Sequence, residues 1–162
     1  YMFRKGHDRA LFDHEMKLIR EYLDISRLHY PDAFTFSCQI DPLLSHVRIP
    51  PLLLHGFVEN IIQHALVPDH TVHIIIYGEY EDGIVTIQIA DDGIGMNEED
   101  TALINSGDFS SSPEGSHVGI KNAVLRLKHF YGEKSSIGIF SQPGMGTTVE
   151  IRVPKEEYRD EN

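Results

Sequence analysis

Polar residues interrupt the apolar pattern of a helix expected over residues 51–66. Glu59, Asn60, Gln63 and His64 fall on neighbouring faces of this helix. Glutamate and asparagine oxygens are hard ligands that suit Mg²⁺, which usually takes one or two protein oxygens together with phosphate oxygens. Asn60 is therefore a candidate magnesium ligand. A solvated helix face explains the same residues, and for this segment alone it is the more common explanation.

The sequence DDGIGM, residues 91–96, directly follows a predicted strand. Glycines at a strand end let the backbone approach a flat ligand closely. The carboxylate of Asp91 could accept a hydrogen bond from an exocyclic amine, which would distinguish adenine from guanine. A D-x-G-x-G sequence is also a common turn, and this alternative stays open.

Two more glycine segments lie towards the C-terminus. Residues 115–119 open an amphipathic helix, whose free N–H groups and positive dipole end would favour a bound phosphate. Lys121 could add positive charge there, whereas we expect Arg126 to be solvated. Residues 144–148 lie between two predicted strands and alone indicate only a hairpin. His70 and His73 lack further ligands at metal-binding spacing.

Hydrophobic periodicity predicts the elements that must position these residues. Helical spacing predicts three long helices, over residues 9–30, 51–66 and 118–131, with proline in the first turn of the second. Alternation predicts five strands, over residues 34–40, 72–80, 84–90, 136–141 and 147–153. Together they predict an α/β two-layer sandwich, with helices on one face of a mixed, largely antiparallel sheet.

Residues 97–116 begin as a short candidate helix and continue into SGDFSSSPEGS, a stretch with few apolar residues. This composition predicts a mobile loop.

Composition restricts the classes of partner. A chain of 162 residues with 41% apolar residues is expected to form one domain around one core. A net charge of -11 argues against a nucleic-acid or anionic-membrane surface, because such surfaces need clustered cations. No apolar run approaches the length of a membrane-spanning helix. The single cysteine, Cys38, excludes an internal disulfide and suggests a cytoplasmic setting.

The order of these motifs resembles the ATPase superfamily shared by DNA gyrase, Hsp90, histidine kinases and MutL. Within it, PPLLLHGFVENIIQHAL, DDGIGM, GSHVGIKNAVLRLKHFYG and GMGTTVEIRVP are similar to the LytS/YesM group of sensor histidine kinases. The opening segment EMKLIREYLDISRLHYPDAF is similar to the region that precedes the catalytic domain in that group.

The resemblance implies a Bergerat-type fold that binds ATP and Mg²⁺. It also implies transfer of the γ-phosphoryl to a histidine of an upstream dimerisation domain, and from there to a response regulator. The expected divisions are a linker helix over residues 1–31, the catalytic domain over 32–156 and a tail over 157–162. The whole protein is expected to be a homodimer associated with the bacterial inner membrane through other segments, with this domain in the cytoplasm.

By motif position, the resemblance implies that Asn60 binds Mg²⁺ and that Glu59 is a catalytic residue beside the metal. It implies that Asp91 binds the exocyclic amine of adenine. Residues 97–118 correspond to the family's ATP lid. Gln63 stands where a lysine is usual, which removes a possible phosphate contact. The other residues expected around the nucleotide are His64, Gly93, Gly95, Met96, Gly115, Val118, Gly119, Lys121, Asn122, Thr147 and Thr148.

Two other functions remain alternatives. One is an ATP hydrolase of the gyrase or Hsp90 type, in which a helix carboxylate activates water. The other is a degenerate nucleotide-sensing module without kinase activity. The family's acceptor histidine lies in a P-H-F-L-F-N-like helix, and no histidine of this chain has that context. His14 and His29 are therefore expected to be ordinary surface or partly packed residues.

Overall fold

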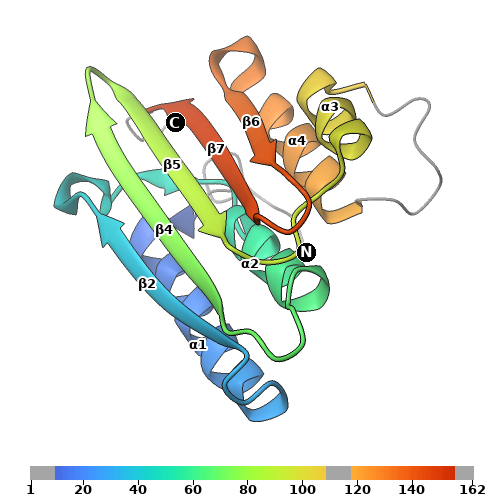
Figure 1. Ribbon diagram of the computed structural model, residues 1–162. Coiled ribbons are helices and arrows are strands. Elements are labelled where there is room, and N and C mark those ends of the chain that lie inside the picture. The colour runs from blue at the N-terminus through green and yellow to red at the C-terminus, as the bar shows by residue number, and fades with distance from the viewer. Residues whose placement is uncertain (1–9, 109–117, 156–162) are drawn as a thin grey trace, which may run out of the picture.

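The computed structural model describes residues 10–108 and 118–155. Five strands form one sheet in the order β2-β4-β5-β7-β6, and α1, α2 and α4 lie on the same face of it (Figure 1). The strands are β2 Phe34–Ile40, β4 Val72–Glu81, β5 Ile84–Asp91, β6 Ser136–Ser141 and β7 Thr147–Pro154. The helices are α1 Phe12–His29, α2 Leu53–His64, α3 Glu98–Ser106 and α4 Val118–Tyr131. The predicted two-layer sandwich is confirmed.

The sheet is mixed and largely antiparallel. β2 pairs in parallel with β4, whereas β4 with β5, β5 with β7, and β6 with β7 pair antiparallel. Alternate residues of the central strands face the helices, so that Ile74, Ile76, Ile87 and Ile151 are fully buried. This burial explains why a two-residue period was legible in the sequence.

The position of β7 shapes the site. This strand follows β6 in the chain, yet it lies between β5 and β6 in the sheet. Its first residue, Thr147, is paired in register with Asp91, the last residue of β5. The turn of residues 144–147, with the sequence G-x-G-T, and the D-x-G-x-G loop are therefore held side by side.

α1 belongs to the same core as the rest of the chain. Phe12, Ile19 and Leu23 are fully buried there. Two-residue strands, β1 Ala10–Leu11 and β3 Arg48–Ile49, pair antiparallel near the start of α1. They are too short to produce a periodic pattern. Within the described ranges, no helix has the length and apolarity to cross a membrane.

The start of α2 differs from the prediction. Pro51 was expected in the first helical turn, but the helix begins at Leu53 and ends at His64. Leu52 is the N-cap residue and has a left-handed backbone, with φ of 62° and ψ of 13°. A leucine side chain has no acceptor for the free N–H groups of the first turn, so another residue must supply one.

Candidate functional site

A cavity of about 730 Å³ lies between α2, the end of β5 and the start of α4. Eight of the residues chosen from the sequence line it, and they come from four separate segments of the chain. These residues are Glu59, Asn60, His64, Asp91, Gly95, Met96, Gly119 and Thr147. The structure thus brings the helix motif, the D-x-G-x-G loop, the start of α4 at Gly119 and the turn that ends at Thr147 to one place.

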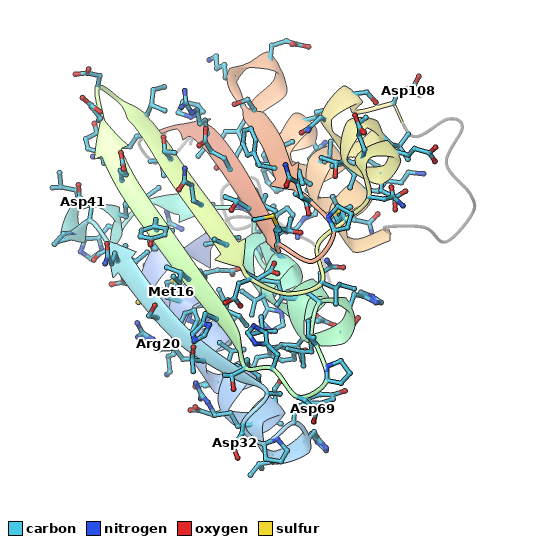
Figure 2. The ribbon with its side chains drawn as sticks, in the orientation of Figure 1. Met16, Arg20, Asp32, Asp41, Asp69 and Asp108 are labelled. Carbon is cyan, nitrogen blue, oxygen red and sulfur yellow. The ribbon has the colours of Figure 1, made fainter. Side chains whose placement is uncertain are left out.

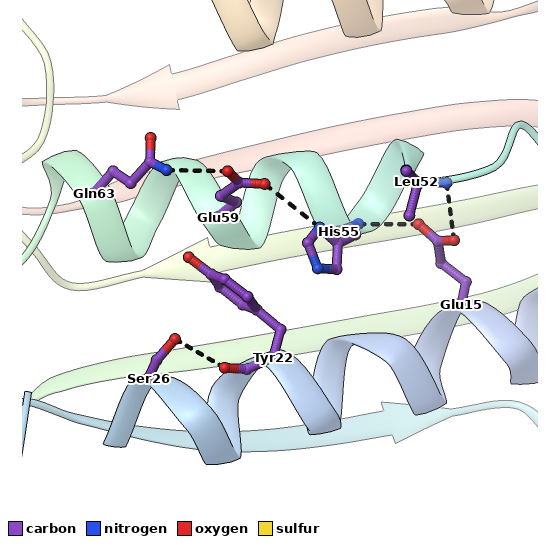
Figure 3. A network of polar contacts seen from close by, with 7 residues as sticks. All are labelled: Glu15, Tyr22, Ser26, Leu52, His55, Glu59 and Gln63. Carbon is purple, nitrogen blue, oxygen red and sulfur yellow. Dashed lines mark hydrogen bonds and ion pairs between the residues drawn. The ribbon is translucent and has the colours of Figure 1, made fainter. Parts of the chain in front are cut away.

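α2 supplies one wall of the cavity. The carboxylate of Glu59 accepts a hydrogen bond from Gln63 Nε2 at 3.0 Å, and its other oxygen lies 3.6 Å from His55 Nδ1 (Figure 3). The amide of Asn60 has no hydrogen-bond partner within the described part of the chain and also faces the cavity. Its oxygen is therefore available to a hard cation such as Mg²⁺, with the Glu59 carboxylate adjacent.

Asp91 supplies a carboxylate at the mouth of the sheet. Burial raises the pKa of Asp91, and the charge of Asp92 adds to this effect, although hydrogen bonds from the backbone N–H groups of Gly93 and Thr147 oppose it. The Gly93 bond to Asp91 Oδ1 is 2.9 Å long. The carboxylate is thus held in place at the cavity by backbone donors.

The neighbouring Asp92 is bound differently. Its two oxygens accept hydrogen bonds from His73, at 2.6 Å from the backbone nitrogen and 2.8 Å from Nδ1. Partial burial raises the pKa of Asp92, but these contacts outweigh it and leave the pKa below its usual value. Only the first carboxylate of the DDGIGM motif lines the cavity.

Glycines lock the two turns against each other. Gly95 has φ of +71°, and a Cβ there would lie 2.0 Å from the carbonyl oxygen of Gln142. Gly146 has φ of +80°, and a Cβ there would lie 1.9 Å from the carbonyl oxygen of Asp91. Neither position can hold a side chain without moving backbone. The G-x-G-T segment therefore supports the site and is more than a hairpin turn.

Gly93 has a packing role in the structure. A Cβ on this residue would lie 2.2 Å from the carbonyl oxygen of Ala65, just beyond α2. The next residue, Ile94, donates its N–H to that same oxygen at 3.0 Å. Gly93 thus lets the loop approach the end of α2, and it is not among the residues that line the cavity.

Ser141 is a supporting residue that the sequence did not reveal. Its hydroxyl oxygen accepts a hydrogen bond from Met96 N, donates to the carbonyl oxygen of Gly146, and contacts Thr147 Oγ1, each at 2.8 Å. It joins the two turns at the cavity. A serine at a strand end carries no distinctive sequence signal. Of the two candidate threonines, Thr147 lines the cavity, whereas Thr148 is outside its lining.

α4 contributes Gly119 and Ile120 to the cavity. Lys121 and Asn122 lie on the same helix but are not among its lining residues. Val118 is the first residue of α4. Gly115, and the part of the expected lid over residues 109–117, lie outside the described residues.

The expectation for Arg126 was wrong. Its side chain is partly buried, and its guanidinium donates a hydrogen bond to the carbonyl oxygen of Pro51. Burial lowers the pKa of Arg126, and the negative charge of Glu15 opposes this effect. The residue therefore joins α4 to the segment preceding α2.

The candidate helix at the start of residues 97–116 is present as α3, Glu98–Ser106. Asn105 on α3 donates to the carbonyl oxygen of Ile139 at 2.8 Å and accepts from its N–H at 2.7 Å. Ile104 on the same helix is buried. Side-chain bonds to the edge strand β6 thus connect α3 to the sheet.

Another hollow, of about 520 Å³, lies between α1 and β2, where Figure 2 shows Met16 and Arg20. Arg20 Nη2 lies 2.9 Å from the sulfur of Cys38. None of the predicted site residues lines it. Within the described residues, no group of three or more His, Cys, Asp or Glu could hold a metal ion. A magnesium ion held by Asn60 together with nucleotide phosphates does not require such a group.

Comparisons with known proteins agree with this arrangement. Residues 51–157 match the family described as histidine kinase-, DNA gyrase B- and HSP90-like ATPase. Sensor histidine kinase YesM from Bacillus subtilis (strain 168) is 30% identical over 148 residues. That alignment covers 91% of this chain and 24% of the relative, so the chain spans about a quarter of the relative's length.

Solved structures share the fold. The histidine kinase domain of the blue-light activated histidine kinase from Erythrobacter litoralis EL346 has a TM-score of 0.62 at 21% identity, covering 91% of this chain and 64% of that one. The histidine kinase AdeS from Acinetobacter baumannii has a TM-score of 0.64 at 14% identity, covering 92% of this chain and 67% of that chain. The catalytic domain of histidine kinase ThkA has a TM-score of 0.63 at 16% identity, covering 91% of this chain and 94% of that chain. The chain belongs to the histidine kinase-, DNA gyrase B- and HSP90-like ATPase family and has the fold of the histidine kinase catalytic domains.

Proposed function

We propose that this chain is the ATP-binding catalytic domain of a two-component sensor histidine kinase. It would transfer the γ-phosphoryl of ATP to a histidine on a separate upstream helical domain, which passes it to a response regulator. One observation carries the proposal: Asn60, Asp91 and Gly119 line the same cavity in a chain of this family. Asn60 offers a ligand for the metal ion, Asp91 an acceptor for the adenine base, and Gly119 a helix N-terminus for the phosphates.

Each residue role follows from its surroundings. Asp91 is held at the cavity by Gly93 and accepts a hydrogen bond from the exocyclic amine of adenine. Gly95, Met96 and Thr147 line the same cavity and would lie against the base. The N-terminal turn of α4 at Gly119 presents backbone N–H groups to the phosphates.

Asn60 and Glu59 fit a magnesium site. Bound Mg²⁺ supplies positive charge that offsets the charge on the transferred phosphoryl group. Asn60 donates an oxygen ligand from α2. Glu59, whose oxygens are contacted by Gln63 and His55, would supply negative charge near the metal ion.

The similarity to sensor histidine kinase YesM favours a kinase over a hydrolase. A hydrolase of the gyrase or Hsp90 type uses a helix carboxylate to take a proton from water. Here Gln63 donates to one oxygen of Glu59, and His55 lies near the other. In a kinase the acceptor imidazole is itself the nucleophile, so positioning and charge neutralisation are the main requirements.

The remaining parts of the proposal concern the whole protein. We propose a homodimer whose dimerisation domain carries the acceptor histidine, with a response regulator as the next partner. This domain would work in the cytoplasm of a bacterium, and attachment to the inner membrane would come from segments outside this chain. The similarity to sensor histidine kinase YesM supports this assignment.

Calorimetric titration tests the nucleotide part of the proposal. We expect Mg²⁺-dependent binding of ATP and ADP, with GTP bound more weakly, because Asp91 reads the adenine amine. Asp91→Ala should remove most binding, whereas the control Asp92→Ala, whose carboxylate is engaged by His73, should retain it. Equal affinity for GTP would exclude Asp91 as the adenine reader.

A transfer assay tests the kinase part. The acceptor domain is supplied together with γ-labelled ATP, and label should appear on its histidine. Release of phosphate to water without labelling of the acceptor would identify a hydrolase. Nucleotide binding without either reaction would identify a sensing module.

A further inference from the structure

Helix α2 is capped by a residue from another helix. Glu15 of α1 is completely buried, and its two carboxylate oxygens accept hydrogen bonds from Leu52 N and His55 N, each at 3.0 Å (Figure 3). These two N–H groups belong to the N-cap and to the third helical residue. In a common capping arrangement they are satisfied by side chains of the helix itself. Here one carboxylate, 37 and 40 positions away in the sequence, satisfies both.

This cap compensates for an unfavourable local sequence. Leu52 makes no side-chain capping bond and adopts a left-handed conformation that is unfavourable for leucine. α2 has only 12 residues, so its placement depends on tertiary contacts. A negative charge at its N-terminus also interacts favourably with the helix dipole.

The same point is tied to α4. Arg126 donates to the carbonyl oxygen of Pro51, and it lies close enough to Glu15 for the two charges to interact. Pro51 immediately precedes the N-cap residue Leu52. α1, α2 and α4 are therefore joined where α2 begins, and both α2 and α4 continue into the walls of the cavity.

A second set of contacts runs along α2 towards the site. His55, whose N–H is bound by Glu15, packs its ring against Tyr22 of α1 with centroids 4.8 Å apart. His55 Nδ1 lies 3.6 Å from Glu59, which in turn bonds to Gln63 (Figure 3). The residue after Glu59 is Asn60. The position of α1 is thus connected, through named contacts, to Glu59, the sequence neighbour of the candidate metal ligand.

We propose that Glu15 is a positioning residue for the nucleotide site: it fixes the start of α2 and thereby the place of Asn60. This inference rests on the proposed function. Because Glu15 belongs to α1, a shift or rotation of α1 changes the metal-dependent part of ATP binding. α1 would then control metal-dependent ATP binding at the site as well as contributing to the hydrophobic core.

The test compares Glu15→Gln with wild type. The carboxamide keeps the size of the side chain but presents an NH₂ group to one of the two N–H donors. ATP affinity is measured by calorimetry in excess Mg²⁺ and again in a chelator. We expect the gain in affinity from Mg²⁺ to fall about tenfold, or about 1.4 kcal/mol, with metal-free affinity changed by less than about twofold.

Two further variants make the result specific. Glu21→Gln removes the same charge from an exposed position of α1 and should behave as wild type. Glu15→Asp keeps a shorter carboxylate and should give an intermediate loss. It also serves as the test variant if Glu15→Gln does not fold. Thermal unfolding is followed for each protein, because a purely structural role would lower the melting temperature without changing the ratio of metal-dependent to metal-free affinity.

The outcomes separate this inference from the proposed function. If wild type binds Mg-ATP and the folded Glu15 variants show the same gain from Mg²⁺, the inference is overturned and the proposed function stands. If wild type binds no ATP, both are overturned. A selective loss of the Mg²⁺-dependent part in the Glu15 variants, with Glu21→Gln unaffected, supports both.

Discussion

Asp91 and Asp92 are adjacent in the sequence, but their surroundings affect ionisation in opposite directions. Burial raises the pKa of Asp91 above that of the unfolded chain. At neutral pH the ionised side chain therefore destabilises the folded state, and this penalty disappears as the pH falls below the unfolded pKa. The contacts with His73 lower the pKa of Asp92. Its ionised form stabilises the folded state above the unfolded pKa, and this contribution is lost as the pH falls through the folded pKa.

We accordingly predict opposite effects for two matched substitutions. Asp91→Asn should unfold at a higher temperature than wild type at about pH 7, because it removes a buried charge while its amide oxygen still accepts from Gly93. Asp92→Asn should unfold at a lower temperature. The difference for Asp91→Asn should shrink as the pH falls towards about pH 4, whereas the difference for Asp92→Asn should largely persist there and disappear only at lower pH. Thermal unfolding followed by circular dichroism at both pH values measures this, and a lower melting temperature for Asp91→Asn at pH 7 would contradict it.

Asn60 is expected to act through the metal ion. Asn60→Ala should remove most of the gain in ATP affinity that Mg²⁺ provides, roughly tenfold, because the ligand oxygen is lost. Affinity measured in a chelator should be nearly unchanged. Asn60→Asp keeps an oxygen at this position and should retain the dependence on Mg²⁺. Calorimetry in the two buffers checks this, and equal losses with and without Mg²⁺ would exclude a role as metal ligand.

At the scale of elements, hydrophobic periodicity predicted which side of each helix or strand faces the core. β4 and β5 were legible because alternate residues such as Ile76 and Ile87 face the core. The first residue of α2 could not be predicted from the local sequence, because the N-terminus of this helix is capped by Glu15 of α1. Arg126 was misjudged for the same reason: its partner, the carbonyl oxygen of Pro51, lies 75 positions away. Local sequence shows which face of an element is apolar, but not which distant polar group meets it.

The anchoring of α3 to β6 leads to a prediction for this element. Asn105→Ala removes both hydrogen bonds to the backbone of Ile139 and should reduce stability by about 1 kcal/mol. Amide hydrogen exchange in α3 should become faster, with β4 and β5 unchanged. Ser106→Ala is the control, because that hydroxyl bonds only within α3 and to the residue shortly after it. Unchanged exchange in α3 of Asn105→Ala would show that Ile104 packing alone holds the helix.

At the scale of the whole molecule, the site is a meeting point of four segments. The resemblance carried by the order of the motifs predicted which segments meet, whereas each motif alone left this open. The motifs did not separate residues that line the cavity from residues that support it. Gly93 packs against Ala65, and Ser141 joins two turns from outside any motif. That distinction depends on distances between atoms, which short sequence patterns do not contain.

A further prediction concerns the chain alone. Transfer needs an imidazole in line with the γ-phosphate, and proximity supplies much of the rate. This chain should bind ATP but remain unlabelled by γ-labelled nucleotide, and addition of the acceptor domain should produce acid-labile label on that domain. His14→Ala and His29→Ala variants are the controls. Stoichiometric labelling of this chain, lost in either variant, would identify an acceptor on α1.

The position of β7 between β5 and β6 has a consequence for biosynthesis. A nascent chain that has not yet produced residues 147–154 lacks the strand that separates and pairs with both neighbours. Until then, one edge of β5, with Val85, Ile87 and Ile89, has open backbone groups that could pair with another chain. The nucleotide pocket also lacks Thr147 at that stage. Completion of the pocket therefore waits for the synthesis of residues 147–154, and chains interrupted before Thr147 are expected to aggregate or to require chaperones.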